Sequence, residues 1–179
     1  MLQLLNLTTD VRVKMLAEIE SDDAAGGAYV SPRLTQVGLR DYPGLLREAA
    51  SSHDDVWLTS QLNQAGRLKT MEERRTKNGV SMVKVPFTAA ETLSEGDFNR
   101  YYIRGVCLFV LVGNPEAEVE VYRAKQVTNP RPESQALIGR RVKAATLLSD
   151  LLVHKKDLET ALGIPAGPNS GLSVCIPVR

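Results

Sequence analysis

The run Tyr101–Val112 contains a single charged side chain, Arg104, and is otherwise almost wholly apolar. A stretch of this kind is stable only where it is shielded from water, in a protein core or in a bilayer. Its uncharged part, residues 106–112, is far too short for a membrane span, which needs about 20 residues in a helix. We therefore expect this segment to form the buried centre of a globular fold.

Two patterns compete over the secondary structure of this segment. The valines of residues 106–112 favour a strand. Upstream, residues 88–91 and 94–97 each match a capping box, the signature of a helix start. Gly113–Pro115 is typical of a helix end. These flanking signals share one consistent frame, so we predict a helix across residues 89–112 and keep a strand over 106–112 as the alternative.

Length and composition are those of one globular domain. The chain has 179 residues, of which 43% are hydrophobic and 24% charged, close to the globular average. No internal repeat or linker divides it. Met1–Leu7 lacks the basic region and cleavage site of a secretion signal, so a cytoplasmic location is expected. Cys107 and Cys175 lie in apolar runs and are expected to be reduced core thiols.

Local signals predict several further elements. Asn78-Gly79 is the sharpest turn signal, and it indicates a protruding charged hairpin or irregular loop over residues 67–84. We also expect a helix capped by Thr9 or Asp10 with Val11, Met15 and Ile19 inward, a helix starting at Asp41–Pro43, and a helix with a Ser52–Asp55 capping box. Short helices are expected at 132–139, 144–153 and 157–162. Strands are expected at 119–127 and 172–177. The predicted fold class is α+β: a single domain, residues 1–179, with several short helices packed on a small mixed or antiparallel sheet around one buried apolar helix.

The residues that usually carry catalysis are sparse. With only His53 and His154 beside the two cysteines, no zinc-ligand spacing can be assembled. A Mg²⁺ site formed by carboxylates remains an alternative. His53 precedes Asp54 and Asp55 at a helix start, where acidic residues are expected for dipole reasons alone. No serine or cysteine has a nucleophile's context. We therefore predict no catalytic residue, no metal ligand and no cofactor.

The segment Glu118–Lys125 resembles the acidic–x–Lys strand of metal-dependent nucleases. Such a site needs a carboxylate and a lysine on one face of the strand. Strand alternation places Glu118 and Glu120 on one face and Lys125 on the other, so a bulge would be required to bring them together. Gly163–Ser173 likewise fails as a phosphate-binding loop, because the lysine and the following helix are absent.

Arg100 and Arg104 are four residues apart and therefore stack on one side of the predicted helix. Two alternatives follow: the pair grips a phosphate, or it anchors the helix through salt bridges with acidic residues. We favour anchoring and expect the two arginines to mark the solvent end of the apolar helix.

Charge is strongly segregated along the chain. The formal net charge is +1, yet residues 67–84 carry a net charge of +4 and residues 123–143 one of +5. Residues 1–66 and 85–122 each carry a net charge of −4. If the two basic segments lie together, they suit a phosphate backbone. Alternatively, basic and acidic patches meet on neighbouring copies and direct self-assembly. The nearly neutral total favours self-assembly.

Three runs, Thr88–Arg104, Val121–Gly139 and Gly167–Pro177, resemble a family of small uncharacterised proteins from phage and prophage-like regions. They cover about a third of the chain. The resemblance implies a mobile-element or virion protein rather than a housekeeping enzyme, and it supplies no catalytic residues. A phage-encoded chain would be located in the virion.

The sequence thus favours a non-enzymatic structural or assembly protein that acts through self-association, as a homo-oligomer or with an assembly partner protein, and without a membrane. The alternative is a nucleic-acid-binding protein or small metal-dependent nuclease. Its contact residues, for nucleic acid or a partner, would be Arg74, Arg75, Lys77, Arg123, Lys125, Arg131, Arg140 and Arg141.

Overall fold

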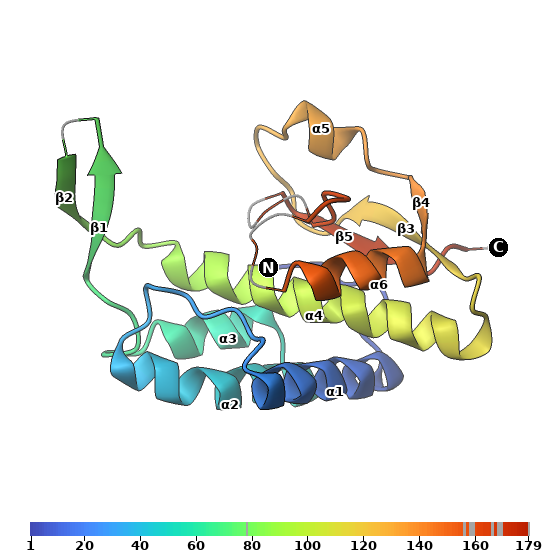
Figure 1. Ribbon diagram of the computed structural model, residues 1–179, viewed down its shortest axis with the longest axis horizontal. Helices are drawn as coiled ribbons and strands as arrows, with labels where there is room; N and C mark the ends of the chain where they lie inside the picture. Colours follow the sequence, from blue (N-terminus) through green and yellow to red (C-terminus); the bar gives the residue numbers. More distant parts are fainter. Residues whose placement is uncertain (78, 156, 158–159, 166, 168–169, 179) are drawn as a thin grey trace.

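The apolar segment lies within one long helix, α4 (Ala89–Gly113), which confirms the helix prediction over the strand alternative. The computed structural model describes residues 1–77, 79–155, 157, 160–165, 167 and 170–178. In Figure 1, α4 runs through the middle of the molecule, with the preceding helices on one side and the following helices and a small sheet on the other. The α+β class and the central apolar helix are therefore confirmed.

Helix α1 (Thr9–Ala25) packs against α4. Val11, Met15 and Ile19 are fully buried, as their spacing predicts. The helix cap is Thr8, whose hydroxyl oxygen accepts a hydrogen bond from the Val11 amide at 3.4 Å, so the predicted cap was one or two residues late. Gly26, in the left-handed conformation, ends the helix as expected.

Helix α2 (Gln36–Ser52) begins earlier than predicted. The Thr35 hydroxyl oxygen accepts from the Gly38 amide at 3.1 Å and caps the helix there. The predicted start at Asp41–Pro43 is wrong because Pro43 lies inside the helix, which continues through it. Helix α3 (Asp55–Leu62) is capped by Asp54 rather than by Ser52, which ends α2.

Helix α4 is buried from Ala89 to Cys107, apart from four half-buried positions. Its apolar end is the more exposed one, since Val112 is 76% exposed. The expectation that Arg100 and Arg104 mark the solvent end is therefore wrong, because both are buried in the middle of the helix. Partners far away in sequence cover them and leave the helix end uncovered.

The larger sheet is antiparallel and has three strands in the order β4 (Arg141–Lys143), β3 (Glu118–Arg123) and β5 (Leu172–Cys175). The strands predicted at 119–127 and 172–177 are thus real but shorter.

Helix α6 (Ala144–Val153) has its predicted bounds. Helix α5 (Pro132–Gln135) covers only the start of residues 132–139. Of the helix predicted at 157–162, residues 158 and 159 lie outside the described residues, and residues 160–162 are not helical.

The smaller sheet is a hairpin of β1 (Met71–Thr76) and β2 (Gly79–Lys84), at the position of the predicted turn. Asn78 of that turn lies outside the described residues. In Figure 1 the hairpin rises away from the start of α4 at one end of the molecule. None of the helices in the described part of the chain has the length and apolar character required to cross a membrane.

Candidate interaction surface

The hairpin, residues 71–84, is called the arm below. Its two strands pack extensively only against each other among the described elements. A two-stranded hairpin without a supporting surface is marginally stable in water. Beyond its base, the arm therefore has little support from the other described elements of the chain.

One face of the arm carries an apolar stripe. Met82 lies opposite Glu73, and Val80 lies opposite Arg75, and residues directly opposite share a face of the ladder. Met71 falls on the same face by alternation. Val80 is 63% exposed and Met82 is 57% exposed. This face joins exposed apolar side chains with charged ones, a composition suited to a protein contact.

The base of the arm is attached firmly to the body. The Arg33 guanidinium donates to both carboxylate oxygens of Glu72, at 2.6 and 3.0 Å. This hydrogen bond with Glu72, although partly opposed by burial, raises the pKa of Arg33. The Lys69 amide also donates to the Arg33 carbonyl at 2.9 Å. The arm is thus held in one direction at its base while its far end is unsupported.

The far end of the arm is cationic. Arg74, Arg75 and Lys77 are exposed, and none of them forms an ion pair with another described residue. These are three of the residues predicted to contact nucleic acid or a partner. Unpaired cations on a protruding element are available to an acidic partner surface.

The second basic segment is mostly engaged within the molecule. Arg123 donates to the Ser170 carbonyl at 2.6 Å. Lys125 contacts Glu91 and Glu95 at 2.7 and 2.8 Å; burial disfavours its charge, but these two hydrogen bonds raise its pKa.

Arg141 approaches Glu120 at 3.5 Å, and Arg131 and Arg140 are exposed on the segment between β3 and β4. In Figure 1 the arm and the β4–α5 region stand well apart, so the fold does not join the two basic segments into one patch.

The nuclease-like carboxylates do not converge on a metal site. Glu120 is turned toward Arg141, while Lys125 lies beyond the end of β3 and binds the carboxylates of α4. Across the described residues, no group of three His, Cys, Asp or Glu side chains is placed to hold a metal ion. The ring of His53 stacks on Trp57 with a centroid distance of 4.4 Å, and Asp55 accepts from the Leu2 amide at 3.1 Å.

Both cysteines are free, as predicted. Burial raises the pKa of Cys107 to about 12, so this thiol is unreactive at neutral pH.

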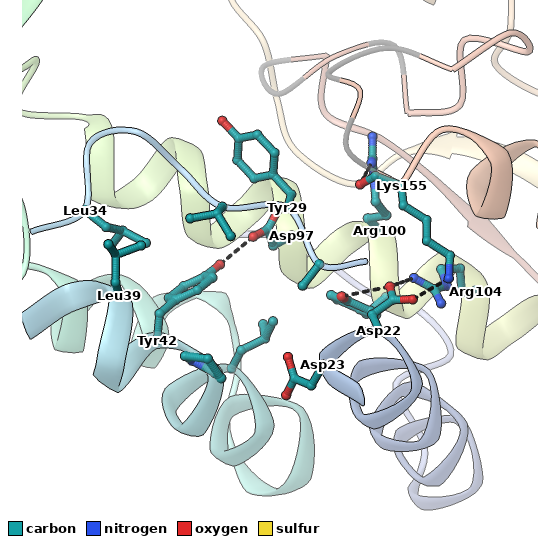
Figure 2. Close-up of a pocket in the computed structure, with 15 residues that line it drawn as sticks. Asp22, Asp23, Tyr29, Leu34, Leu39, Tyr42, Asp97, Arg100, Arg104 and Lys155 are labelled. Atoms are coloured by element: carbon teal, nitrogen blue, oxygen red, sulfur yellow. Dashed lines mark hydrogen bonds and ion pairs between the residues drawn. The ribbon is translucent and has the colours of Figure 1, made fainter. Parts of the chain in front are cut away.

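A buried ionic network joins α1 to α4, and Figure 2 shows it from the side of a small enclosed pocket. Arg104, which is 1% exposed, donates to Glu18 at 2.6 Å and to Asp22 at 2.5 Å. Lys155 donates to the second oxygen of Asp22 at 2.6 Å. The Arg100 guanidinium donates to backbone carbonyls, including that of His154 at 2.9 Å. Neither arginine is free for a phosphate. The expected anchoring through salt bridges is observed for Arg104, whereas Arg100 is anchored by hydrogen bonds to backbone carbonyls.

Asp97 is the exception in this region. Its carboxylate accepts a hydrogen bond from the Tyr42 hydroxyl at 2.6 Å, as Figure 2 shows, and forms no ion pair with another described residue. Burial raises the pKa of Asp97 to about 6, against the opposing effects of the Tyr42 hydrogen bond and the charge of Arg100. Burial and the neighbouring Asp97 together raise the pKa of Tyr42. This pair was not predicted from the sequence, because the residues around Asp97 indicate only a capping box.

A groove of about 720 Å³ runs along α4 on the side of Asp97 and opens near the base of the arm. We call it the groove. Its described walls come from α4, Leu2, the α1–α2 connection, the base of the arm, residues 125–127, Asp157, and residues 165, 167, 170 and 171. Its volume is in the range of pockets that bind drug-sized ligands. No sequence motif signals it, because its walls come from parts of the chain that are far apart in sequence.

Comparison with known proteins gives no relatives: no protein-family model, no curated protein and no solved structure matches the chain.

Proposed function

We propose that this chain is a non-enzymatic structural or assembly protein that works through self-association, with the arm as its principal contact. The observation that carries the proposal is a hairpin that is held at its base by Arg33, packs extensively on no other described element and presents Val80 and Met82 to solvent. Apolar side chains in this position gain free energy when a partner covers them, at roughly 25 cal/mol per Å² of buried apolar area.

The electrostatics of the molecule support the same role. The cations at the end of the arm have no ion-pair partners in the described structure, whereas residues 1–66 and 85–122 supply an excess of acidic side chains. Complementary charge of this kind accelerates the encounter of copies and selects their orientation. The resemblance to phage and prophage proteins fits an assembly role, in the virion or in the cytoplasm of the host cell.

The test is the mass of the protein in solution as a function of its concentration. The wild-type chain is expected to form oligomers at high concentration and low salt. Val80→Glu combined with Met82→Glu places charge in the apolar stripe without touching the core, and is expected to yield a monomer at the same concentration. Sedimentation velocity or light scattering measures both.

Val13→Glu is a matched control, since Val13 is 56% exposed on α1 and the chemical change is the same. It should leave the wild-type mass distribution unaltered. A wild-type chain that stays monomeric at every concentration would count decisively against the proposal. So would an arm variant that associates as well as wild type.

A second function, nucleic-acid binding, is favoured by one observation. The arm is a two-stranded ribbon that carries Arg74, Arg75 and Lys77, and the major groove of DNA admits a ribbon of this type. Binding would weaken with salt by roughly 0.9 log units per log unit of salt for each phosphate neutralised. Absence of duplex retardation at low salt removes this candidate. The nuclease version has no metal-ligand group among the described residues to support it.

A further inference from the structure

The groove has a wall suited to apolar side chains. Leu2 and Leu93 lie at its surface and are themselves nearly buried, at 8% and 7% exposed. Pro86, Val127 and Pro165 add further apolar contact area. A surface of this composition would be matched by the apolar stripe of an arm.

The charged groups of the groove are not all compensated. Each cation among the described residues of the groove is already engaged: Arg33 by Glu72, Lys125 by Glu91 and Glu95, and Arg100 by backbone carbonyls. Within the described part of the chain, Asp97 accepts a hydrogen bond only from the Tyr42 hydroxyl and forms no ion pair. The groove therefore has room for one more cationic donor, directed at the carboxylate of Asp97.

The arm carries the apolar and cationic side chains that this groove would bind, but it cannot reach the groove of its own chain. Its base is held by the ion pair between Arg33 and Glu72, and from there it rises away from α4, as Figure 1 shows. Arg74, Arg75 and Lys77 at its far end are consequently directed away from Asp97 of the same chain. A second copy is free of this restriction.

We infer that the groove is the receptor for the arm of a second copy. The apolar stripe of the incoming arm covers the wall around Leu2 and Leu93, and a cation from its far end binds Asp97. The inference rests on the proposed self-association through the arm, and it names the surface that the arm meets.

Complementation between two defective variants tests it. The arm variant, Val80→Glu with Met82→Glu, keeps an intact groove. The groove variant, Thr92→Trp, keeps an intact arm and fills the space beside α4, because Thr92 lines the groove and is half-buried. Each variant alone is expected to be monomeric in sedimentation velocity. An equimolar mixture is expected to form a one-to-one complex, since it contains one functional arm and one functional groove.

Asp97→Asn supplies a second, milder variant in case Thr92→Trp perturbs the fold. The amide retains an acceptor for Tyr42 but loses the negative charge. Since a hydrogen bond from a cation to a charged carboxylate is stronger than one to a neutral amide, self-association should weaken by about tenfold or more. Glu20→Gln is the control, because Glu20 is exposed on α1, away from the groove, and the same charge is removed.

The outcomes separate the two proposals. A monomeric wild type contradicts the self-association itself. If wild type associates and the arm variant does not, while Thr92→Trp and Asp97→Asn both associate like wild type, the arm binds elsewhere and the groove assignment is wrong. A mixture of the arm and groove variants that stays monomeric overturns it as well.

Discussion

Asp22 and Asp97 both lie beside arginines of α4, but their surroundings move their pKa values in opposite directions. Burial disfavours the charge of Asp22, yet direct hydrogen bonds from Arg104 and Lys155 outweigh burial and lower its pKa. Asp97 is dominated by burial, because Arg100 influences it only through space and Tyr42 donates a single hydrogen bond. The opposite pKa shifts of the two carboxylates thus follow from which cations reach each carboxylate directly.

This contrast predicts a pH dependence of stability that is specific to Asp97. A carboxyl group with a folded-state pKa of about 6 binds its proton more tightly than in the unfolded chain, where the value is about 3.9. Its contribution to stability is therefore complete below about pH 4 and is lost as the pH rises through about 6. Asp97→Asn lacks this loss, so the unfolding free energy of the variant should rise by roughly 2–3 kcal/mol relative to wild type across that window.

Urea unfolding of both proteins between pH 4 and pH 7 measures the difference. Other titrating groups affect both proteins equally and cancel in the comparison. Two curves of unfolding free energy that run parallel over this range would show that Asp97 titrates normally.

At the scale of elements, α2 is positioned by one close approach. A Cβ atom on Gly38 would lie 2.2 Å from the carbonyl oxygen of Arg67, which accepts a hydrogen bond from the Thr35 amide at 3.0 Å. Gly44, in the same helix, has open space where its Cβ would lie. We predict that Gly38→Ala destabilises the fold by roughly 2–4 kcal/mol. Gly44→Ala should stabilise it by about 0.5–1 kcal/mol through helix propensity.

Chemical denaturation of this pair provides its own control, since each variant adds one methyl group to a glycine of α2. Equal effects of the two substitutions would mean that the chain following α3 does not pack on the start of α2 as described. That contact also determines where the arm leaves the body, so Gly38→Ala is expected to disturb the arm as well.

The same helices show what local sequence signals can and cannot predict. The pattern at residues 88–91 and the Gly113–Pro115 stop predicted α4 correctly as one long helix. The capping boxes themselves are wrong in detail, because Thr88 makes no side-chain capping hydrogen bond and residues 94–97 lie inside the helix. The start of α2 was placed wrongly at Asp41–Pro43, since proline is usual in a first turn. The actual cap, Thr35, is supported by its contact with Arg67, which no local pattern reveals.

For the whole molecule, one buried apolar helix and one sharp turn were enough to predict an α+β domain with a protruding charged segment. The functional surface was harder to predict, because its members are distant in the chain. Tyr42 and Asp97 are brought together only by the packing of α2 on α4. The two basic segments, adjacent to the apolar helix in sequence, end up apart because β4 and the arm lie at different ends of the fold.

The central claim is that the arm becomes buried when copies associate, and hydrogen exchange of its backbone amides tests that claim most directly. An unsupported hairpin opens readily, so its amides should exchange quickly in dilute protein. The account predicts that protection of β1 and β2 rises steeply with protein concentration, while the amides of α4 are protected throughout. Arm amides that exchange equally fast in dilute and concentrated protein, while the mass of the particle grows, would contradict it.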